Sequence, residues 1–246
     1  MNQIVVTGMV LSATPVGEYD KRVVILTKEQ GKISAFAKGS RRINSPLMGA
    51  VTPFSFGEFT IYEGRNSYTI QSANIKNYFS ELRTDIEGAY YGFYFLEFAS
   101  YYVKEANDER EMLKLLYQTM KALTNSKIPN QLIRYIFELK TVCINGEGPQ
   151  VFQCVSCGKS SKDFMFSAQR GGVLCHDCLR DVVDGIYLKN STLYTMQYIE
   201  SSSIEKLYTF LVNEEVMEQL DKIMERYRTL YIDKKFKSLE ILETLI

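Results

Sequence analysis

The chain has 246 residues, of which 46% are hydrophobic and 24% are charged. This is enough apolar material for a core and more than one small domain usually holds, so we expect two domains, or one large domain with an insert. Lysine plus arginine equal aspartate plus glutamate at 29 each, so the charge of the whole chain gives no argument for nucleic acid. No stretch approaches the roughly 18 uncharged apolar residues of a membrane span, which excludes a transmembrane protein.

The N-terminal segment and the cysteines indicate the compartment. Residues 1–15 are apolar but lack a basic start and a small-residue cleavage site, so they predict a strand rather than a signal peptide. Four of the five cysteines form two tight pairs, which favours a metal site in a reducing compartment over a disulfide framework. We therefore expect a cytoplasmic protein.

The first part of the chain has the pattern of a small barrel. Short β-branched or aromatic runs alternate with turn residues and predict strands at 4–11, 22–27, 32–37, 51–62 and 67–75. Five short strands in under 80 residues match an OB-type barrel. Within the fourth run the apolar phase shifts at Gly57, which predicts a β-bulge.

After Tyr78 the apolar residues follow a helical period. Helices are expected at about 82–101, 113–123, 130–145, 191–199, 204–212 and 214–231. On the first helix the predicted buried face consists of Leu82, Ile86, Ala89, Phe93, Leu96 and Tyr101. The fold class is thus α+β, with an OB-fold domain over residues 1–80 and a helical domain over residues 81–246. The cysteine pairs form an insert in the helical domain, at about 150–180.

The cysteine pairs carry the strongest single signal. They are Cys154, Cys157, Cys175 and Cys178, and 17 residues separate the two pairs. Each Cys-x-x-Cys aims two thiolates at one point, so together they predict a tetrahedral zinc site. Two alternatives stay open: four thiols without a metal, and ligation by His176, the only histidine. Cys143 has no partner and is expected in the core.

The remaining motifs argue against an enzyme. A zinc ion held by four thiolates has no open coordination position, so the site is structural. The chain contains no phosphate-binding loop, no dinucleotide fingerprint, no nucleophile elbow and no deaminase signature. With one histidine, inside a cysteine knuckle, the usual acid–base group is missing. A zinc-ribbon enzyme with an unrecognised site is the alternative.

Basic residues gather in the predicted barrel. Residues 1–80 hold nine basic and five acidic residues, a difference of +4. The densest run contains Lys21, Arg22, Lys28, Lys32, Lys38, Arg41 and Arg42, with Glu29 as its only acid. Such charges can follow a phosphate backbone, and residues 38–42 add backbone N–H groups and a hydroxyl. Tyr19, Phe36 and Tyr68 offer stacking faces for bases. The alternative is a solvated charged surface.

Several short motifs follow one another in a specific order along nearly the whole chain. They are Gly17-Glu-Tyr-Asp20, Leu26-Thr27 with Gly31, Ala37-Lys-Gly-Ser-Arg-Arg42 with Ser45-Pro46, Thr52-Pro-Phe54, Phe137-Glu-Leu, Gly146, Pro149, the two cysteine pairs with Gly158 and Gly171-Gly172, and Lys237-Ser238-Leu239. In this order they resemble the RecO family of DNA repair and recombination mediators.

The resemblance implies a function and a set of partners. It implies binding of single- and double-stranded DNA, annealing of complementary strands, and action with RecR to help RecA displace single-strand-binding protein, in a nucleoid-associated cytoplasmic protein. Lys38, Arg41 and Arg42 match the family's basic loop, with Lys21 and Arg22 as further DNA contacts. The family does not retain the zinc cysteines throughout, so the metal supports the fold. The alternative is an interaction adaptor with only incidental DNA contact.

Overall fold

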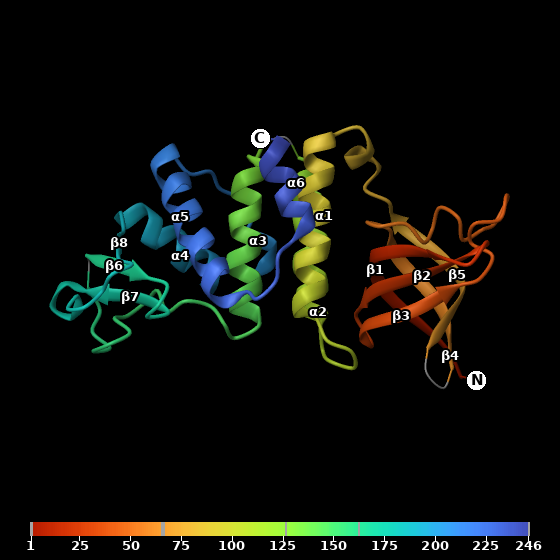
Figure 1. Ribbon diagram of the computed structural model, residues 1–246, viewed down its shortest axis with the longest axis horizontal. Helices are drawn as coiled ribbons and strands as arrows, with labels where there is room; N and C mark the ends of the chain where they lie inside the picture. Colours follow the sequence, from red (N-terminus) through yellow and green to blue (C-terminus); the bar gives the residue numbers. More distant parts are fainter. Residues whose placement is uncertain (1, 65–66, 126, 162, 246) are drawn as a thin grey trace. The chain divides into compact units, whose positions relative to one another are not determined.

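The computed structural model describes residues 2–64, 67–125, 127–161 and 163–245. The chain divides into two compact units, Met1–Ser126 with Phe236–Ile246, and Lys127–Lys235. The first unit contains a five-stranded barrel and three helices, and the second contains three helices and a small sheet (Figure 1). The predicted α+β class is confirmed.

Five strands form the barrel. They are β1 (Asn2–Val16), β2 (Asp20–Thr27), β3 (Gly31–Ala37), β4 (Phe56–Glu63) and β5 (Tyr68–Asn77). They pair in the order β1-β2-β3-β5-β4, and β4 pairs back to β1. Neighbours are antiparallel except β3 and β5, which are parallel. This order agrees with the predicted OB-type barrel.

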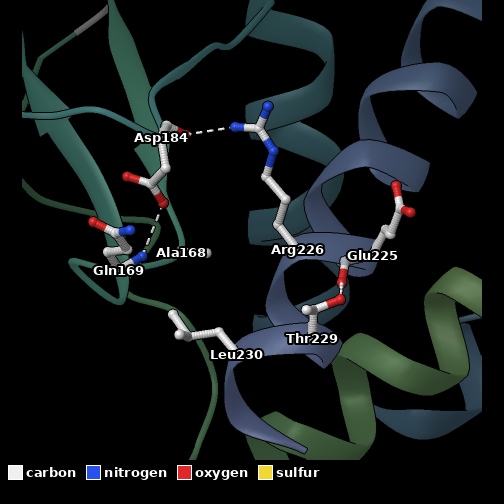
Figure 2. A pocket seen from close by; sticks show the side chains of 7 residues that line it. All are labelled: Ala168, Gln169, Asp184, Glu225, Arg226, Thr229 and Leu230. Carbon is white, nitrogen blue, oxygen red and sulfur yellow. Dashed lines mark hydrogen bonds between the residues drawn. The ribbon is translucent and has the colours of Figure 1, made fainter.

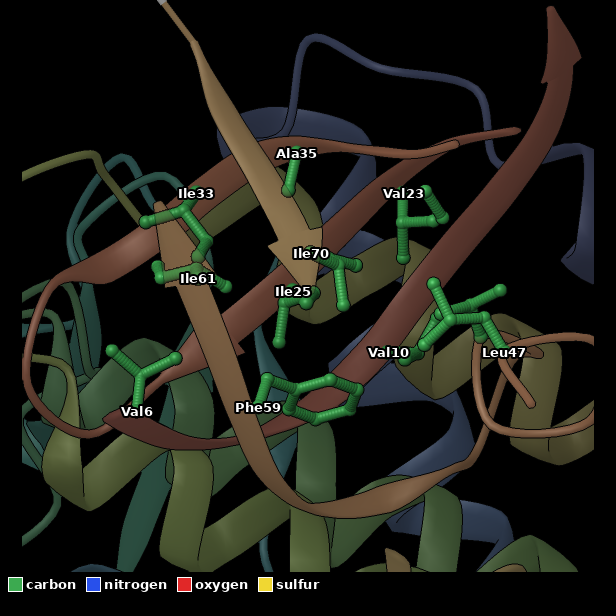
Figure 3. Close-up of a cluster of buried hydrophobic side chains, with 12 residues drawn as sticks. Val6, Val10, Val23, Ile25, Ile33, Ala35, Leu47, Phe59, Ile61 and Ile70 are labelled. Atoms are coloured by element: carbon green, nitrogen blue, oxygen red, sulfur yellow. The ribbon is translucent and has the colours of Figure 1, made fainter. Parts of the chain in front are cut away.

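The barrel core follows from strand alternation. Along β3, buried residues alternate with half-buried ones, because successive side chains of a strand point to opposite faces. Figure 3 shows inward side chains from all five strands, among them Val6, Ile25 and Phe59. Leu47 belongs to the same core although it lies in the loop between β3 and β4. The core therefore anchors that loop.

The fourth strand differs from its prediction at one end. Residues 51–55 form turns, so the strand begins at Phe56, while Val51 packs into the barrel core. The bulge predicted at Gly57 is confirmed, because the β4–β5 register shifts between Phe56 and Gly57. A Cβ atom at Gly57 would lie 2.3 Å from the Asn74 carbonyl oxygen, which explains the glycine.

Three helices complete the first unit: α1 (Ile86–Tyr102), α2 (Arg110–Leu123) and α6 (Lys237–Leu245), with a short 3₁₀ turn, η1 (Ser80–Arg83), before α1. Asp85 caps α1 by accepting a hydrogen bond from Gly88 N at 3.0 Å. Helix α6, which the sequence pattern did not predict, packs on α1, where the Ser238 hydroxyl donates to Glu97 at 2.6 Å.

The predicted buried face of the first helix is wrong in part. Ile86 is 71% exposed and Phe93 is 42% exposed, whereas Tyr94 and Phe98 are fully buried. Aromatic residues surround this helix, so apolar spacing does not select one face. Phe93 nevertheless packs on Phe54 of the loop before β4, with ring centroids 4.8 Å apart.

The second unit contains α3 (Asn130–Ile144), α4 (Asn190–Ser201) and α5 (Glu214–Tyr231). Its sheet has the order β7-β6-β8, from β6 (Phe164–Ser167), β7 (Gly172–Cys175) and β8 (Ile186–Tyr187). The helix predicted at 204–212 is reduced to a 3₁₀ turn, η3 (Ile204–Lys206). Phe210 instead packs against Tyr198, with ring centroids 5.2 Å apart. None of the helices in the described ranges is long and apolar enough to span a membrane.

Candidate nucleic-acid interface and metal centre

Residues 38–42, the basic loop, follow β3 and lie against the turn between β1 and β2. The Asp20 carboxylate accepts from Gly39 N at 2.7 Å, and the Tyr19 carbonyl accepts from Arg41 N at 2.9 Å. The Arg41 side chain adds a third bond, from Nη1 to the Gly17 carbonyl at 3.1 Å. These bonds fix the loop to the turn.

The backbone of the basic loop is already engaged. Besides the bonds from Gly39 and Arg41, Ser40 N donates to the Ala37 carbonyl and Arg42 N donates to the Gly39 carbonyl. The Ser40 side chain is fully buried. The sequence predicts free N–H groups and a hydroxyl for phosphate here, but the N–H groups of residues 39–42 bond within the protein and the hydroxyl is buried. Long basic side chains remain as the groups that can meet a ligand.

Those side chains form a cationic cluster. Lys38, Arg41 and Arg42 are exposed, and Lys21 pairs with Ala37 directly before the loop. Burial lowers the pKa of Lys21, and the nearby Arg41 charge lowers it further. Two cations that repel one another in the free protein are stabilised when an anion binds beside both.

Arg22 lies on another face of the barrel. It neighbours Lys21 on β2, so their side chains point to opposite faces. Arg22 Nε donates to the Ser34 hydroxyl at 2.8 Å, and Arg22 pairs with Phe36 across the ladder. The structure thus brings Lys21 near Arg41 and Arg42 near Tyr19, leaves Lys38 exposed at the start of the basic loop, and places Arg22 apart from Lys21.

Of the three aromatic residues predicted as stacking faces, Tyr19 lies at the basic loop. The Arg42 guanidinium carbon is 5.0 Å from the centroid of the Tyr19 ring, and the Tyr19 side chain is 43% exposed. Phe36 and Tyr68 lie on β3 and β5, where each is half-buried. Only the fold reveals that Tyr19 and Arg42, 23 residues apart in sequence, meet.

The four paired cysteines converge in the second unit. The sulfur atoms of Cys154, Cys157, Cys175 and Cys178 all lie within 4.8 Å of one another. Cys157 Sγ and Cys175 Sγ are 3.7 Å apart. Four sulfurs at about 2.3 Å from a tetrahedral zinc ion are about 3.8 Å apart. The donor set and its spacing fit a structural zinc ion.

Local structure places each pair. The first pair lies in a turn in which Gly158 N donates to the Cys154 carbonyl at 2.8 Å, and Gly158 has a φ of 70°. Cys175 ends β7, and Cys178 ends the following 3₁₀ turn, η2 (His176–Cys178). Val155 N donates to the Val173 carbonyl at 2.9 Å and joins the two pairs.

The surroundings of this cluster shift the pKa values of its thiols in opposite directions. Burial raises the pKa of the Cys154 thiol, but backbone N–H groups of Cys175, Cys157 and Ser156 outweigh it and lower the value to about 6. The hydrogen bond with Cys157, followed by burial, raises the pKa of Cys178 to about 12. A cation among the four sulfur atoms would stabilise their thiolate forms.

Cys143 and His176 are not part of the four-cysteine group. Cys143, near the end of α3, is partly buried, and desolvation raises the pKa of its thiol to about 12. It remains a neutral thiol, but it is only partly buried, so the predicted core position is not confirmed. His176 is exposed within η2, and the metal-binding group found in the described residues consists of the four cysteines.

The second unit also has a pocket of about 480 Å³ beside α5 (Figure 2). Its polar groups bond largely within the protein. Arg226 Nη1 donates to the Asp184 carbonyl at 2.6 Å, and the Asp184 carboxylate accepts from Gln169 N at 2.9 Å. Asp184 thus joins the β6–β7 turn to the segment before β8, and Arg226 joins that segment to α5.

Comparison with known proteins covers the whole chain. Residues 1–79 match the family model described as Recombination protein O N terminal, and residues 83–240 match Recombination protein O C terminal. The chain is 34% identical over 236 residues to the DNA repair protein RecO of Alkaliphilus metalliredigens, covering 95% of this chain and 96% of the relative. It is 29% identical over 247 residues to the DNA repair protein RecO of Acetivibrio thermocellus, covering 100% and 98%.

These matches extend over the barrel, the helices and the cysteine cluster. They favour a role in recombination and repair over that of an interaction adaptor. The chain belongs to the Recombination protein O (RecO) family of DNA repair proteins.

Proposed function

We propose that the protein is a DNA-binding recombination mediator that holds phosphates with Lys38, Arg41 and Arg42. Lys21 lies beside them and adds a fourth contact, and Arg22 adds a contact from the outer face of β2. The observation that carries this proposal is the fixed basic loop, whose N–H groups bond inside the protein while its charged side chains are exposed.

The proposed role includes the partners that the RecO resemblance implies. The protein would bind single- and double-stranded DNA, anneal complementary strands, and act with RecR on single-strand-binding protein so that RecA can load. This role is non-enzymatic and belongs in the cytoplasm, at the nucleoid. Strand annealing with and without single-strand-binding protein is the functional test. An adaptor with incidental DNA contact would not anneal strands that are coated by single-strand-binding protein.

The proposed phosphate contacts are tested by the double variant Arg41→Ala/Arg42→Ala. Fluorescence anisotropy on single-stranded oligonucleotides of several sequences should show weaker binding by similar factors for each sequence. The slope of log K against log salt should flatten by roughly 0.7–0.9 per lost contact. Lys206→Ala/Lys222→Ala removes two exposed charges from the second unit and is the matched control.

Arg-to-Lys changes at the same two positions should be milder, because phosphate accepts a point charge even when the bidentate fork is lost. Unchanged affinity and slope in the alanine double variant, with an intact circular dichroism spectrum, would place the DNA surface elsewhere. That result would favour the adaptor.

We also propose that Cys154, Cys157, Cys175 and Cys178 hold one structural zinc ion per chain. When bound, zinc would stabilise four thiolates and link the first knuckle to β7. Metal analysis of the purified protein should give one equivalent. Cys175→Ser should lose it, while Cys143→Ser, outside the cluster, should keep it. A purified protein with well under one equivalent would argue for four free thiols.

For the domains, we propose that residues 1–80 form the OB-fold DNA-binding domain and residues 81–246 the helical domain, with the zinc insert at about 150–180. The two matched family models meet between residues 79 and 83, which supports this boundary. Because α1, α2 and α6 belong to the same compact unit as the barrel, the domains should unfold with shared cooperativity. Hydrogen exchange measured through the denaturant transition tests this boundary.

A further inference from the structure

Tyr19 is the aromatic residue that the basic loop holds in place. Its backbone carbonyl accepts from Arg41 N at 2.9 Å, and the Arg42 guanidinium lies 5.0 Å from its ring centroid. The next residue, Asp20, binds Gly39 N at 2.7 Å. The basic loop thus holds the backbone at Tyr19 and Asp20. The Tyr19 side chain stays 43% exposed.

The Arg42 guanidinium lies over the Tyr19 ring in a cation–π contact. A guanidinium is planar and delocalised, so it stacks on an aromatic face and is also attracted by the ring quadrupole. A nucleobase is a further planar group that can extend such a stack, and each base stacked on an aromatic side chain contributes substantially to single-strand binding. Because the pair is already assembled in the free protein, little ordering is needed when a base adds to it.

The surrounding charges supply the complementary contact. Arg41 bonds to the Gly17 carbonyl in the turn that carries Tyr19, and the Lys21 pKa is sensitive to the Arg41 charge. A strand whose phosphates meet these cations passes beside the ring, because Arg42 lies over it and Arg41 bonds to the turn that carries it. In a duplex the base faces are covered by their neighbours, so a duplex can use the cations but not the ring.

We propose that the Tyr19–Arg42 pair is a base-stacking platform that makes this end of the barrel favour single-stranded over duplex nucleic acid. This inference rests on the proposed function, since it requires that phosphates bind at the basic loop. It adds a specificity-determining residue that carries no charge.

The test compares Tyr19→Ala and Tyr19→Phe in the full chain by anisotropy on an oligothymidylate, an abasic strand of equal length, and a duplex. Tyr19→Ala should lose roughly five- to a hundredfold in affinity for oligothymidylate. Its affinity for the abasic strand and the duplex should stay within about twofold, and its salt slope should not change, because no charge is lost. Tyr19→Phe should keep the affinity of the unmodified protein.

Tyr194→Ala is the matched control, because Tyr194 is 67% exposed on α4 in the second unit. Tyr19→Leu keeps apolar bulk without a flat face, should behave like Tyr19→Ala, and replaces it if that variant does not fold. Unchanged binding to oligothymidylate, or an equal loss on all three ligands, overturns the platform. If Arg41→Ala/Arg42→Ala still lowers affinity and slope, only the stacking inference fails; if it does not, the proposed function fails as well.

Discussion

At the residue scale, Ser40 carries a buried hydroxyl that makes no hydrogen bond to the described residues. A buried hydroxyl without a partner costs free energy, so we expect Ser40→Ala to raise the free energy of unfolding by about 1 kcal/mol. DNA affinity should not change. Ser55 is the matched control: it is equally buried, but its hydroxyl bonds to Thr52 at 3.1 Å. Urea denaturation should show Ser55→Ala less stable and Ser40→Ala more stable, and a marked loss in both would contradict the assignment.

Tyr135 makes the free energy of unfolding fall at alkaline pH. Burial, followed by the hydrogen bond from its hydroxyl to Asp221 at 2.6 Å, raises the Tyr135 pKa above its ordinary value. Above about pH 10 the unfolded phenol loses a proton that the folded one keeps. The contribution of the protonated Tyr135 to the free energy of unfolding is therefore fully present below pH 10 and is lost as pH rises further. Denaturant unfolding between about pH 9 and 11 should show a free energy of unfolding that declines with pH, and the decline should be shallower in Tyr135→Phe. Tyr194→Phe is the control and should decline like the unmodified protein. An equally steep decline in Tyr135→Phe would refute this prediction.

At the scale of elements, a buried ionic group joins α3 and α5. The Glu138 carboxylate is fully buried and binds Arg134 Nε at 2.9 Å and Arg228 Nη1 at 2.7 Å. Glu138→Gln leaves two largely buried guanidinium groups without this anion, so it should lower the free energy of unfolding by about 3 kcal/mol. Lys189→Met breaks the exposed Lys189–Glu215 pair and should change it by less than about 1 kcal/mol. If chemical denaturation gives equally small losses of unfolding free energy for Glu138→Gln and Lys189→Met, the buried ionic group contributes no more than a surface pair.

At the scale of the whole molecule, the proposed zinc site and the basic loop belong to different compact units. Zinc binding is coupled to folding in such sites, so chelation should raise amide exchange in residues 150–188 and leave the barrel protected. DNA affinity should fall by less than about threefold, since phosphate contact depends on the basic loop. Hydrogen exchange and anisotropy on the same chelated sample check both expectations. Exchange spreading through the barrel would mean that the metal stabilises both units.

Much of the molecule is encoded in local patterns. The strands β2 and β3, the bulge at Gly57 and the helix α5 follow from alternation, phase and period within short segments. The wrong predictions for residues 204–212 and for the buried face of α1 have a common cause. Residues 204–212 and the exposed aromatic residues of α1 were misassigned because apolar spacing records what can be buried, while neighbours distant in sequence decide what is buried.

The sequence by itself therefore determined the α+β class, the barrel and the four-cysteine group, because each depends on residue types at short, fixed spacings. Only the tertiary structure decided that the N–H groups of residues 39–42 bond within the protein and that Arg42 lies over the Tyr19 ring. Those outcomes require the β1–β2 turn to meet the loop after β3, and the antiparallel β2–β3 pairing makes that contact because it places the start of β2 beside the end of β3.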